Sequence, residues 1–376
     1  MPAAVRPKML CMKIRFYMPL LCTALLCTTI VYAGDRPKIR FDYDVTFSTT
    51  FDNREYDKSE LDYSCTLFGL RAQTAVGVSI GKEGRSPKHR LLGGVDPLYE
   101  FGGGWKIQPL LYYQFTTHLE RSRFEIVAGA FPRAKSGAYY SEAFYSSRTK
   151  FLDDTYEGLQ FSWRGRNFYY EVGVDWMGQI RQASPATREQ FAVYSGGHHY
   201  FPFGLKLGYS AYLHHYACSM LSPNVVDDVL LNPYVEMNVG HWLHMQSLTA
   251  RIGYLQAVQR DRYVSKDYFV PAKGEFFLEA RKWNVGIFND FFVGGDMMPL
   301  FNAVGPDGVQ YGQNLYMGDP FLRNPVGVKC GIYDKVALYY EPDIVKKLHL
   351  RIQAEFHFNN AGYQGTRQVI AVSYDL

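Results

Sequence analysis

The chain has 376 residues, with 40 lysines and arginines against 36 aspartates and glutamates, and aromatic residues make up 16% of it. Four of the basic residues lie in the first fifteen positions, so the rest of the chain is close to neutral. This balance argues against nucleic acid as a partner, because no basic excess is present to release counterions.

The first 33 residues have the profile of a secretory signal peptide. Basic residues precede an apolar run over 17–32, and small residues at Val31 and Ala33 suit signal peptidase. The run is shorter than the roughly 20 apolar residues of a spanning helix. We therefore expect a cleaved signal peptide over 1–33 and one exported domain over 34–376. Three widely spaced cysteines remain after residue 33, and this odd number does not predict a disulfide framework.

Strict alternation of apolar and polar residues follows the signal. Apolar residues stand at every second position over 39–47, between Lys38, Arg40, Asp42 and Asp44, and the same pattern recurs over 348–358. A period of two indicates extended strands with one apolar and one polar face.

The same alternation of apolar and polar residues predicts sixteen strands. Fourteen is the alternative, if one hairpin is miscounted. The predicted strands cover 39–47, 68–80, 91–101, 107–116, 123–131, 159–164, 168–177, 190–197, 205–215, 230–239, 248–255, 274–281, 283–292, 333–340, 348–358 and 363–376.

Short and long connections alternate between these strands. Short ones are predicted at 164–167, 281–283 and 341–347, and long ones at 132–157, 260–273 and 294–332. With the first strand starting in the periplasm, the two sets fall on opposite sides of a sheet. The short turn at 101–105 is the exception, because it falls on the side of the long loops.

The last strand resembles the assembly signal of Gram-negative outer-membrane β-barrels. Ile370, Val372, Tyr374 and Leu376 alternate up to the carboxyl terminus, although members of this class usually end on Phe or Trp. The resemblance implies an all-β, transmembrane, antiparallel up-and-down barrel of porin-like type in the cell outer membrane. It also implies contact with outer-membrane lipid, lipopolysaccharide and the barrel-insertion machinery.

The polar faces of the strands carry charges of both signs, which we expect to line a polar, water-filled lumen. The predicted pore-lining residues are Arg71, Arg123, Glu125, Arg164, Glu171, Asp175, Arg251, Glu275, Arg351, Glu355 and Arg367. A soluble β-sandwich could also show these residues to water and remains the alternative fold. The signal peptide, the terminal strand and the aromatic residues at strand ends favour the barrel.

The long loop after the fifth strand occupies the place of the third outer loop of porins, which often folds into the lumen. Its predicted constriction residues are Arg133, Tyr139, Tyr140, Phe144 and Tyr145. The alternative is an exposed loop that covers the mouth.

Four paired motifs could carry chemistry: His198-His199, His214-His215, Asp153-Asp154 and Asp227-Asp228. Neighbours on a strand point to opposite faces, so the members of a histidine pair cannot both bind one ion without a turn. The acidic pairs fall in predicted outer loops, where they could bind a cation or act as catalytic acids. We expect no catalytic residue, no metal site and no cofactor.

The function that fits this pattern is a porin-like channel for passive diffusion of small polar solutes, with saccharides as one candidate class. The alternative is an outer-membrane barrel enzyme or a surface-binding barrel whose function lies in the extracellular loops. The pattern carries no signal for an oligomeric state.

Overall fold

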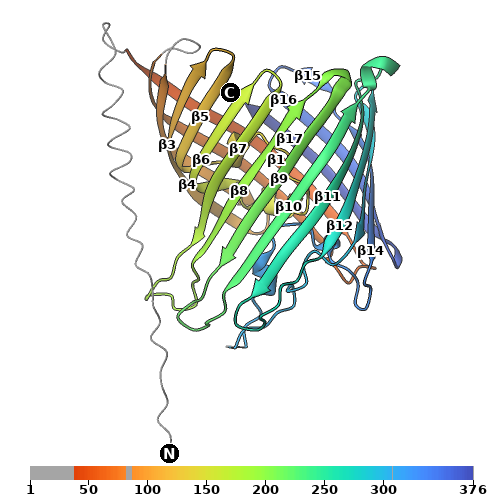
Figure 1. Cartoon of the computed structure of the whole chain (residues 1–376). Helices are drawn as coiled ribbons and strands as arrows, with labels where there is room; N and C mark the ends of the chain where they lie inside the picture. Colours follow the sequence, from red (N-terminus) through yellow and green to blue (C-terminus); the bar gives the residue numbers. More distant parts are fainter. Residues whose placement is uncertain (1–37, 82–86, 307, 376) are drawn as a thin grey trace, which may run out of the picture. The chain divides into compact units, whose positions relative to one another are not determined.

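Each long strand pairs antiparallel with its neighbours in the chain, and the first strand pairs with the last (Figure 1). The computed structural model describes residues 38–81, 87–306 and 308–375. The predicted signal peptide over 1–33 and the terminal Leu376 lie outside the described residues.

The strands of the barrel wall have the following bounds. They are β1 (Ile39–Glu55), β2 (Cys65–Ile80), β3 (Lys88–Glu100), β4 (Gly104–Leu119), β5 (Ser122–Pro132), β6 (Thr155–Gly165), β7 (Phe168–Gly178), β8 (Gln190–Tyr200), β9 (Leu205–Tyr216), β10 (Val226–Asn238), β11 (Ser247–Asp261), β12 (Ala272–Lys282), β13 (Val285–Gly294), β14 (Gly331–Tyr340), β16 (Leu348–Asn359) and β17 (Gly362–Asp375). A short strand, β15 (Asp343–Val345), adds to the edge of β16.

The barrel closes where β1 pairs with β17, from Thr46 opposite Asp375 to Glu55 opposite Thr366. Closure gives β1 a partner on the β17 side from Thr46 to Glu55, so the backbone donors and acceptors of this closed part of the wall are satisfied within it. The prediction of an all-β, up-and-down barrel of sixteen strands is confirmed, and the soluble sandwich is ruled out.

Strand boundaries differ from the predicted ones by a few residues. The strand predicted over 283–292 begins two residues later, at Val285, because Trp283 and Asn284 have φ values of 53° and 65°. Two successive positive φ angles form a tight two-residue hairpin turn. The first strand is much longer than its apolar alternation and continues to Glu55.

The two ends of the barrel differ in their connections. One end, called the loop end, carries the connections 56–64, 101–103, 133–154, 179–189, 217–225, 262–271, 295–330 and 360–361. The other end, called the turn end, carries the remaining connections and the outer limits of β1 and β17. The long loops lie together at the lower end in Figure 1, as predicted. The short 101–103 connection lies at the loop end as well, with positive φ at Gly102 and Gly104 on either side of its tip.

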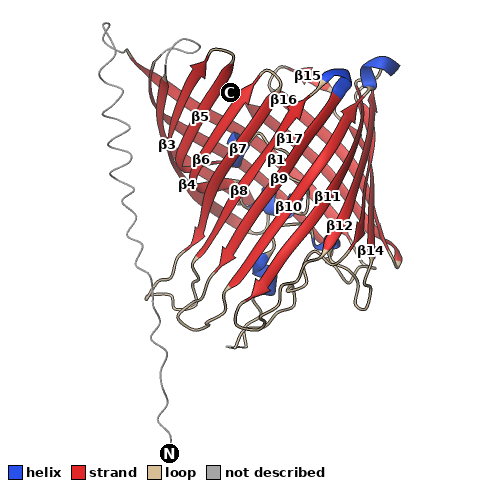
Figure 2. Cartoon of the chain, viewed as in Figure 1, coloured by secondary structure: helices blue, strands red, loops and turns tan. Residues whose placement is uncertain are grey.

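The helical segments are short (Figure 2). They are α2 (Ser147–Leu152) and the 3-10 turns η1 (Arg133–Lys135), η2 (Pro202–Gly204), η3 (Gly240–Leu243), η4 (Gly312–Leu315) and η5 (Pro320–Leu322). Within the described ranges, no helix is long and apolar enough to cross a membrane.

The two faces of the wall have opposite chemistry. On β1, Phe41 is 73% exposed on the outside, while Asp52 and Arg54 are buried on the inside. Outward residues elsewhere are also apolar, such as Leu111, Ile252 and Ile352. An apolar exterior around a charged interior is the arrangement of a barrel in a bilayer.

Candidate functional site

The eleven predicted pore-lining residues all point into the barrel, because each lies at one of the alternate strand positions whose side chains face inward. Arg123 faces Arg164 across β5 and β6, and Ser162 pairs with Glu171 across β6 and β7. On β16 and β17, Glu355 and Arg367 are directly opposite each other. The structure therefore places residues that lie far apart in the sequence on one inner face, and their role as the lining of an open pore stays a prediction.

Most of these charges are buried by other side chains. Glu275 and Glu355 are 0% and 2% exposed, and Glu125, Glu171, Asp175 and Arg251 are also buried. Arg123, Arg164 and Arg351 are more exposed, and they lie toward the turn end. The interior is thus filled toward the loop end and more open at the turn end, whereas we had expected one water-filled bore.

Loop 133–154 fills part of the interior. The Tyr139 hydroxyl donates to Glu275 Oε1 on β12 at 2.7 Å, and the Arg251 guanidinium lies 3.9 Å from the Tyr139 ring centroid. Tyr140 donates to Glu171 Oε1 on β7 at 2.9 Å. A loop that reaches β7, β11 and β12 from its origin at β5 must cross the lumen.

Arg133 anchors the start of this loop. It is buried between the rings of Tyr145 and Tyr156, with its guanidinium carbon 5.1 and 4.2 Å from their centroids. Its Nη2 lies 2.9 Å from Asp153 and 3.3 Å from Asp175. Phe144 packs edge-on against Tyr212 of β9 at 5.5 Å. The structure thus places all five of these residues inside the barrel, and their role as a constriction stays a prediction.

A second loop in the lumen, 295–330, was expected only as a long outer loop. Its Met317 carbonyl accepts from Ser146 N at 2.7 Å, and Asp319 N donates to the Glu142 carbonyl at 2.8 Å. Glu142 in turn pairs with Lys335, which is buried on β14. The apolar run Met297-Met298-Pro299-Leu300-Phe301 could have indicated this, because such a loop needs a surface to pack against.

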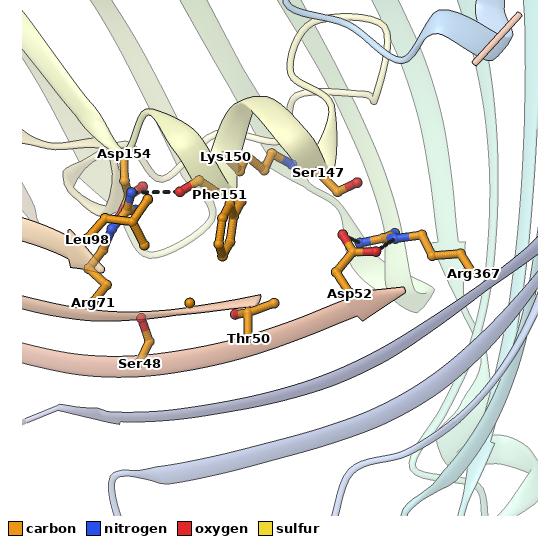
Figure 3. A pocket seen from close by; sticks show the side chains of 11 residues that line it. Ser48, Thr50, Asp52, Arg71, Leu98, Ser147, Lys150, Phe151, Asp154 and Arg367 are labelled. Atoms are coloured by element: carbon orange, nitrogen blue, oxygen red, sulfur yellow. Dashed lines mark hydrogen bonds and ion pairs between the residues drawn. The ribbon is translucent and has the colours of Figure 1, made fainter. Parts of the chain in front are cut away.

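Helix α2 begins at a serine cap, where Ser146 Oγ accepts from Thr149 N at 3.1 Å. One face of the helix, formed by Ser147, Lys150 and Phe151, lines a gap of about 280 Å³ against the wall. Figure 3 shows these side chains opposite Ser48 and Thr50 of β1, with Arg71 and Asp154 at one side and Asp52 and Arg367 at the other.

The charges in this gap differ in their partners. Arg71 pairs with Asp96 and Asp154, and Arg367 pairs with Asp52 and Glu355. The Lys150 ammonium makes no hydrogen bond or ion pair with any residue that the structure describes, whereas its backbone N–H donates to the Ser146 carbonyl at 3.0 Å. Burial raises the pKa of the Asp154 carboxyl to about 6, against the opposing effect of Arg71.

Two further cavities lie at either end of this gap. A vestibule of about 740 Å³ at the loop end is lined by loop 56–64, loop 295–330 and the other face of α2, with Arg148, Thr149 and Leu152. A cavity of about 220 Å³ on the turn-end side of the gap is lined by Asp44, Thr46 and Lys135. The three hollows follow the inward row of β1 from the loop end toward the turn end.

Three of the four paired motifs lie on strands and are split by the wall: His198-His199 on β8, His214-His215 on β9 and Asp227-Asp228 on β10. The expected outer-loop position is wrong for Asp227-Asp228. Asp153-Asp154 lies in loop 133–154, where Asp153 pairs with Arg133 and Asp154 with Arg71. His214 and Asp228 face the interior, where Asp228 accepts from Tyr212 Oη at 2.6 Å. His215 and Asp227 face outward, with His215 Nδ1 3.0 Å from Asp227 Oδ1. Among the described residues, no group of three or more possible metal ligands comes together, and Cys65, Cys218 and Cys330 are free thiols.

Solved structures with the same architecture are outer-membrane proteins of Vibrio cholerae. A loop L8 deletion mutant of OmpT matches 90% of this chain and 99% of its own length, with 12% sequence identity and a TM-score of 0.53. An in-vitro folded, trimeric form of OmpT matches the same shares at 12% identity with a TM-score of 0.51. At this identity the likeness shows the fold, which is that of an outer-membrane β-barrel of porin-like class.

The sequence comparisons give a different kind of finding. No curated protein sequence matches this chain. A family model described as lipid A 3'-O-deacylase-type matches residues 37–250, which run from the start of β1 into β11. Because this match covers more than half of the 376 residues, the chain belongs to the lipid A 3'-O-deacylase-type family.

Proposed function

We propose that this barrel is a porin-like channel in the cell outer membrane, through which small polar solutes diffuse along the inner face of β1. The loop end faces the outside of the cell and the turn end faces the periplasm. The observation that carries the proposal is the row of three hollows beside β1, of about 740, 280 and 220 Å³.

The gap beside α2 is the middle part of this route. Its lining carries the cations Arg71, Lys150 and Arg367 against the carboxylates Asp52 and Asp154. In a confined space of low dielectric, a single uncompensated charge strongly affects which ions enter. The lining itself therefore carries one more cation than carboxylates. The Lys150 ammonium feels Glu142 and Asp154 without forming an ion pair, so it is the cation that a solute would meet free, and we expect the gap to favour anions.

The same proposal covers export of the chain, its assembly in the membrane and its lipid partners. The signal peptide is cleaved after export, the apolar exterior contacts outer-membrane lipid and lipopolysaccharide, and the barrel-insertion machinery assembles the strands. Tyr374 supports this view of the last strand, because it shares the outward face of β17 with Ile370 and Val372.

Planar-bilayer recording tests the channel directly. The purified protein should form ohmic channels, and in a salt gradient the reversal potential should indicate anion preference. Lys150→Glu should shift the reversal potential toward cation preference, because it reverses the unpaired charge in the gap. The matched control is Lys266→Glu, a reversal of an exposed lysine in loop 262–271, which should leave the reversal potential unchanged. Absence of conductance, or an equal shift in both variants, would overturn the proposal.

A second candidate function is hydrolysis of an acyl chain from an outer-leaflet lipid, as the description of the family suggests. The observation in its favour is the outward pair of His215 and Asp227 near the loop end of β9 and β10. Asp227 also accepts from Arg262 Nε at 2.6 Å and Nη2 at 2.9 Å, which fixes the carboxylate that orients the imidazole. His215 could then act as general base toward a water molecule.

Mass spectrometry of lipid A tests this candidate. Membranes that contain the wild-type protein should lose an acyl chain from lipid A, and membranes with His215→Gln should retain it. Asp227→Asn should have the same effect, because it removes the charge that orients and stabilises the imidazolium. Unmodified lipid A with the wild-type protein would reject this candidate and leave the channel proposal untouched.

A further inference from the structure

The vestibule at the loop end has the chemistry of a binding site. Its volume of about 740 Å³ lies within the range of pockets that hold small ligands. Helix α2 lines it on the side of the gap, and loops 56–64 and 295–330 line its other sides. Three segments far apart in the sequence therefore build it, and Arg323 joins the two loops by donating to the Leu61 carbonyl.

The charged side chains of the vestibule neutralise one another. Arg148 lies 3.2 Å from Asp62. With Glu60 and Arg323, the lining contains two cations and two carboxylates. Both guanidinium groups also cover aromatic rings, Arg148 at 4.4 Å from the Tyr63 centroid and Arg323 at 3.7 Å from the Phe301 centroid. No net charge is left to attract an ion.

The uncharged polar groups are free by contrast. The side-chain amides of Asn302, Gln313 and Asn314 line the vestibule and make no hydrogen bond to a residue in the described ranges. Each amide offers both donors and an acceptor. Tyr63, which is 64% exposed, adds an amphipathic ring to the rim.

We infer that the vestibule binds a neutral saccharide before it passes α2. Sugar hydroxyls both donate and accept hydrogen bonds, which matches free amides. The apolar face of a sugar ring matches the exposed side of the Tyr63 ring, opposite the side that Arg148 covers. A charged solute would lose hydration without gaining an unpaired counter-charge. This inference deepens the proposed channel function and rests on it for the onward path, but binding itself does not require conduction.

Calorimetry on the full-length protein in detergent tests the binding step, with maltotriose as the neutral probe and trigalacturonate as the anionic probe. Maltotriose should bind and trigalacturonate should bind at least tenfold more weakly. Tyr63→Ala and Asn314→Ala should each weaken maltotriose binding about fivefold, as expected for one ring or one hydrogen bond. Tyr263→Ala is the matched control, because Tyr263 is 58% exposed on loop 262–271 and does not line the vestibule.

Conductance of the same variants separates this inference from the channel proposal. Channels that conduct normally but give no heat with maltotriose would overturn the saccharide site alone. Stronger binding of trigalacturonate than of maltotriose, or equal losses in Tyr63→Ala and Tyr263→Ala, would overturn it as well. Maltotriose binding to a protein without conductance would support the site and reject the channel.

Discussion

Arg367 of β17 and Asp52 of β1 form a two-point ion pair across the seam where the barrel closes, with Nε–Oδ1 at 2.7 Å and Nη2–Oδ2 at 3.0 Å. The same guanidinium reaches both carboxylate oxygens of Glu355 on β16 at 3.0 Å. The side chains of Asp52 and Glu355 are 2% and 3% exposed. One arginine therefore compensates two buried carboxylates on three adjacent strands.

Replacing Arg367 by methionine should destabilise the barrel strongly. It removes the only arginine that pairs with Glu355 among the described residues and leaves Asp52 with Arg54, which lies 2.8 Å away. Breaking a buried pair in this way costs about 3–5 kcal/mol. The measurement is urea unfolding of the refolded protein in lipid vesicles. Arg123→Met is the control: its side chain is 49% exposed, so the loss should stay within about 1 kcal/mol. Equal losses would show that the seam does not depend on this network.

The outward face of β16 gives a prediction about the membrane. Ile352 is 43% exposed on the outside of the wall, opposite Ile370 of β17. Ile352→Arg should lower the free energy of unfolding in vesicles by about 2–4 kcal/mol, because it places a charge against hydrocarbon near the midplane. Ile352→Leu should change it by less than about 1.5 kcal/mol. A small effect of the arginine would place this position outside the bilayer.

The gap beside α2 should respond to pH. As pH falls through about 6, Asp154 takes up a proton and the gap loses one negative charge, so anion preference should increase. Asp154→Asn should show the higher preference already at pH 7.5 and little change down to pH 5. Because the folded-state pKa lies above the ordinary 3.8, ionisation of this carboxyl also lowers the stability of the fold as pH rises from 3.8 to about 6. The same pH response in the asparagine variant would assign it to another group.

Much of the wall was predictable from the sequence because outward positions that face lipid are mostly apolar, while charged residues lie mostly at inward positions. This alternation located all sixteen strands and placed Arg71, Glu171 and Glu355 on the inner face. It could not show which charges meet, because Asp52 and Arg367 are separated by almost the whole barrel sequence and become neighbours only at closure.

The filling of the lumen was predicted only in part. The position and aromatic content of loop 133–154 indicated that it could enter the barrel, but its partners lie on β7, β11 and β12. Loop 295–330 has no periodic pattern; the apolar run over 297–301 indicates that it packs against a surface, but not that its partners are Ser146 and Glu142. The gap itself is a product of both loops and the wall.

The most direct test of the route along β1 uses two neighbouring threonines. Thr50 points into the gap beside α2, whereas Thr49 lies on the opposite, outward face of the same strand. Thr50→Cys and Thr49→Cys are made in a protein with Cys65, Cys218 and Cys330 replaced by serine, and a cationic methanethiosulfonate reagent is added during planar-bilayer recording. The account predicts that the current falls and anion preference rises further in Thr50→Cys, while Thr49→Cys is unaffected. Two results would contradict the account. One is an unchanged current in a Thr50→Cys protein that mass spectrometry shows to be modified, and the other is the absence of any channel.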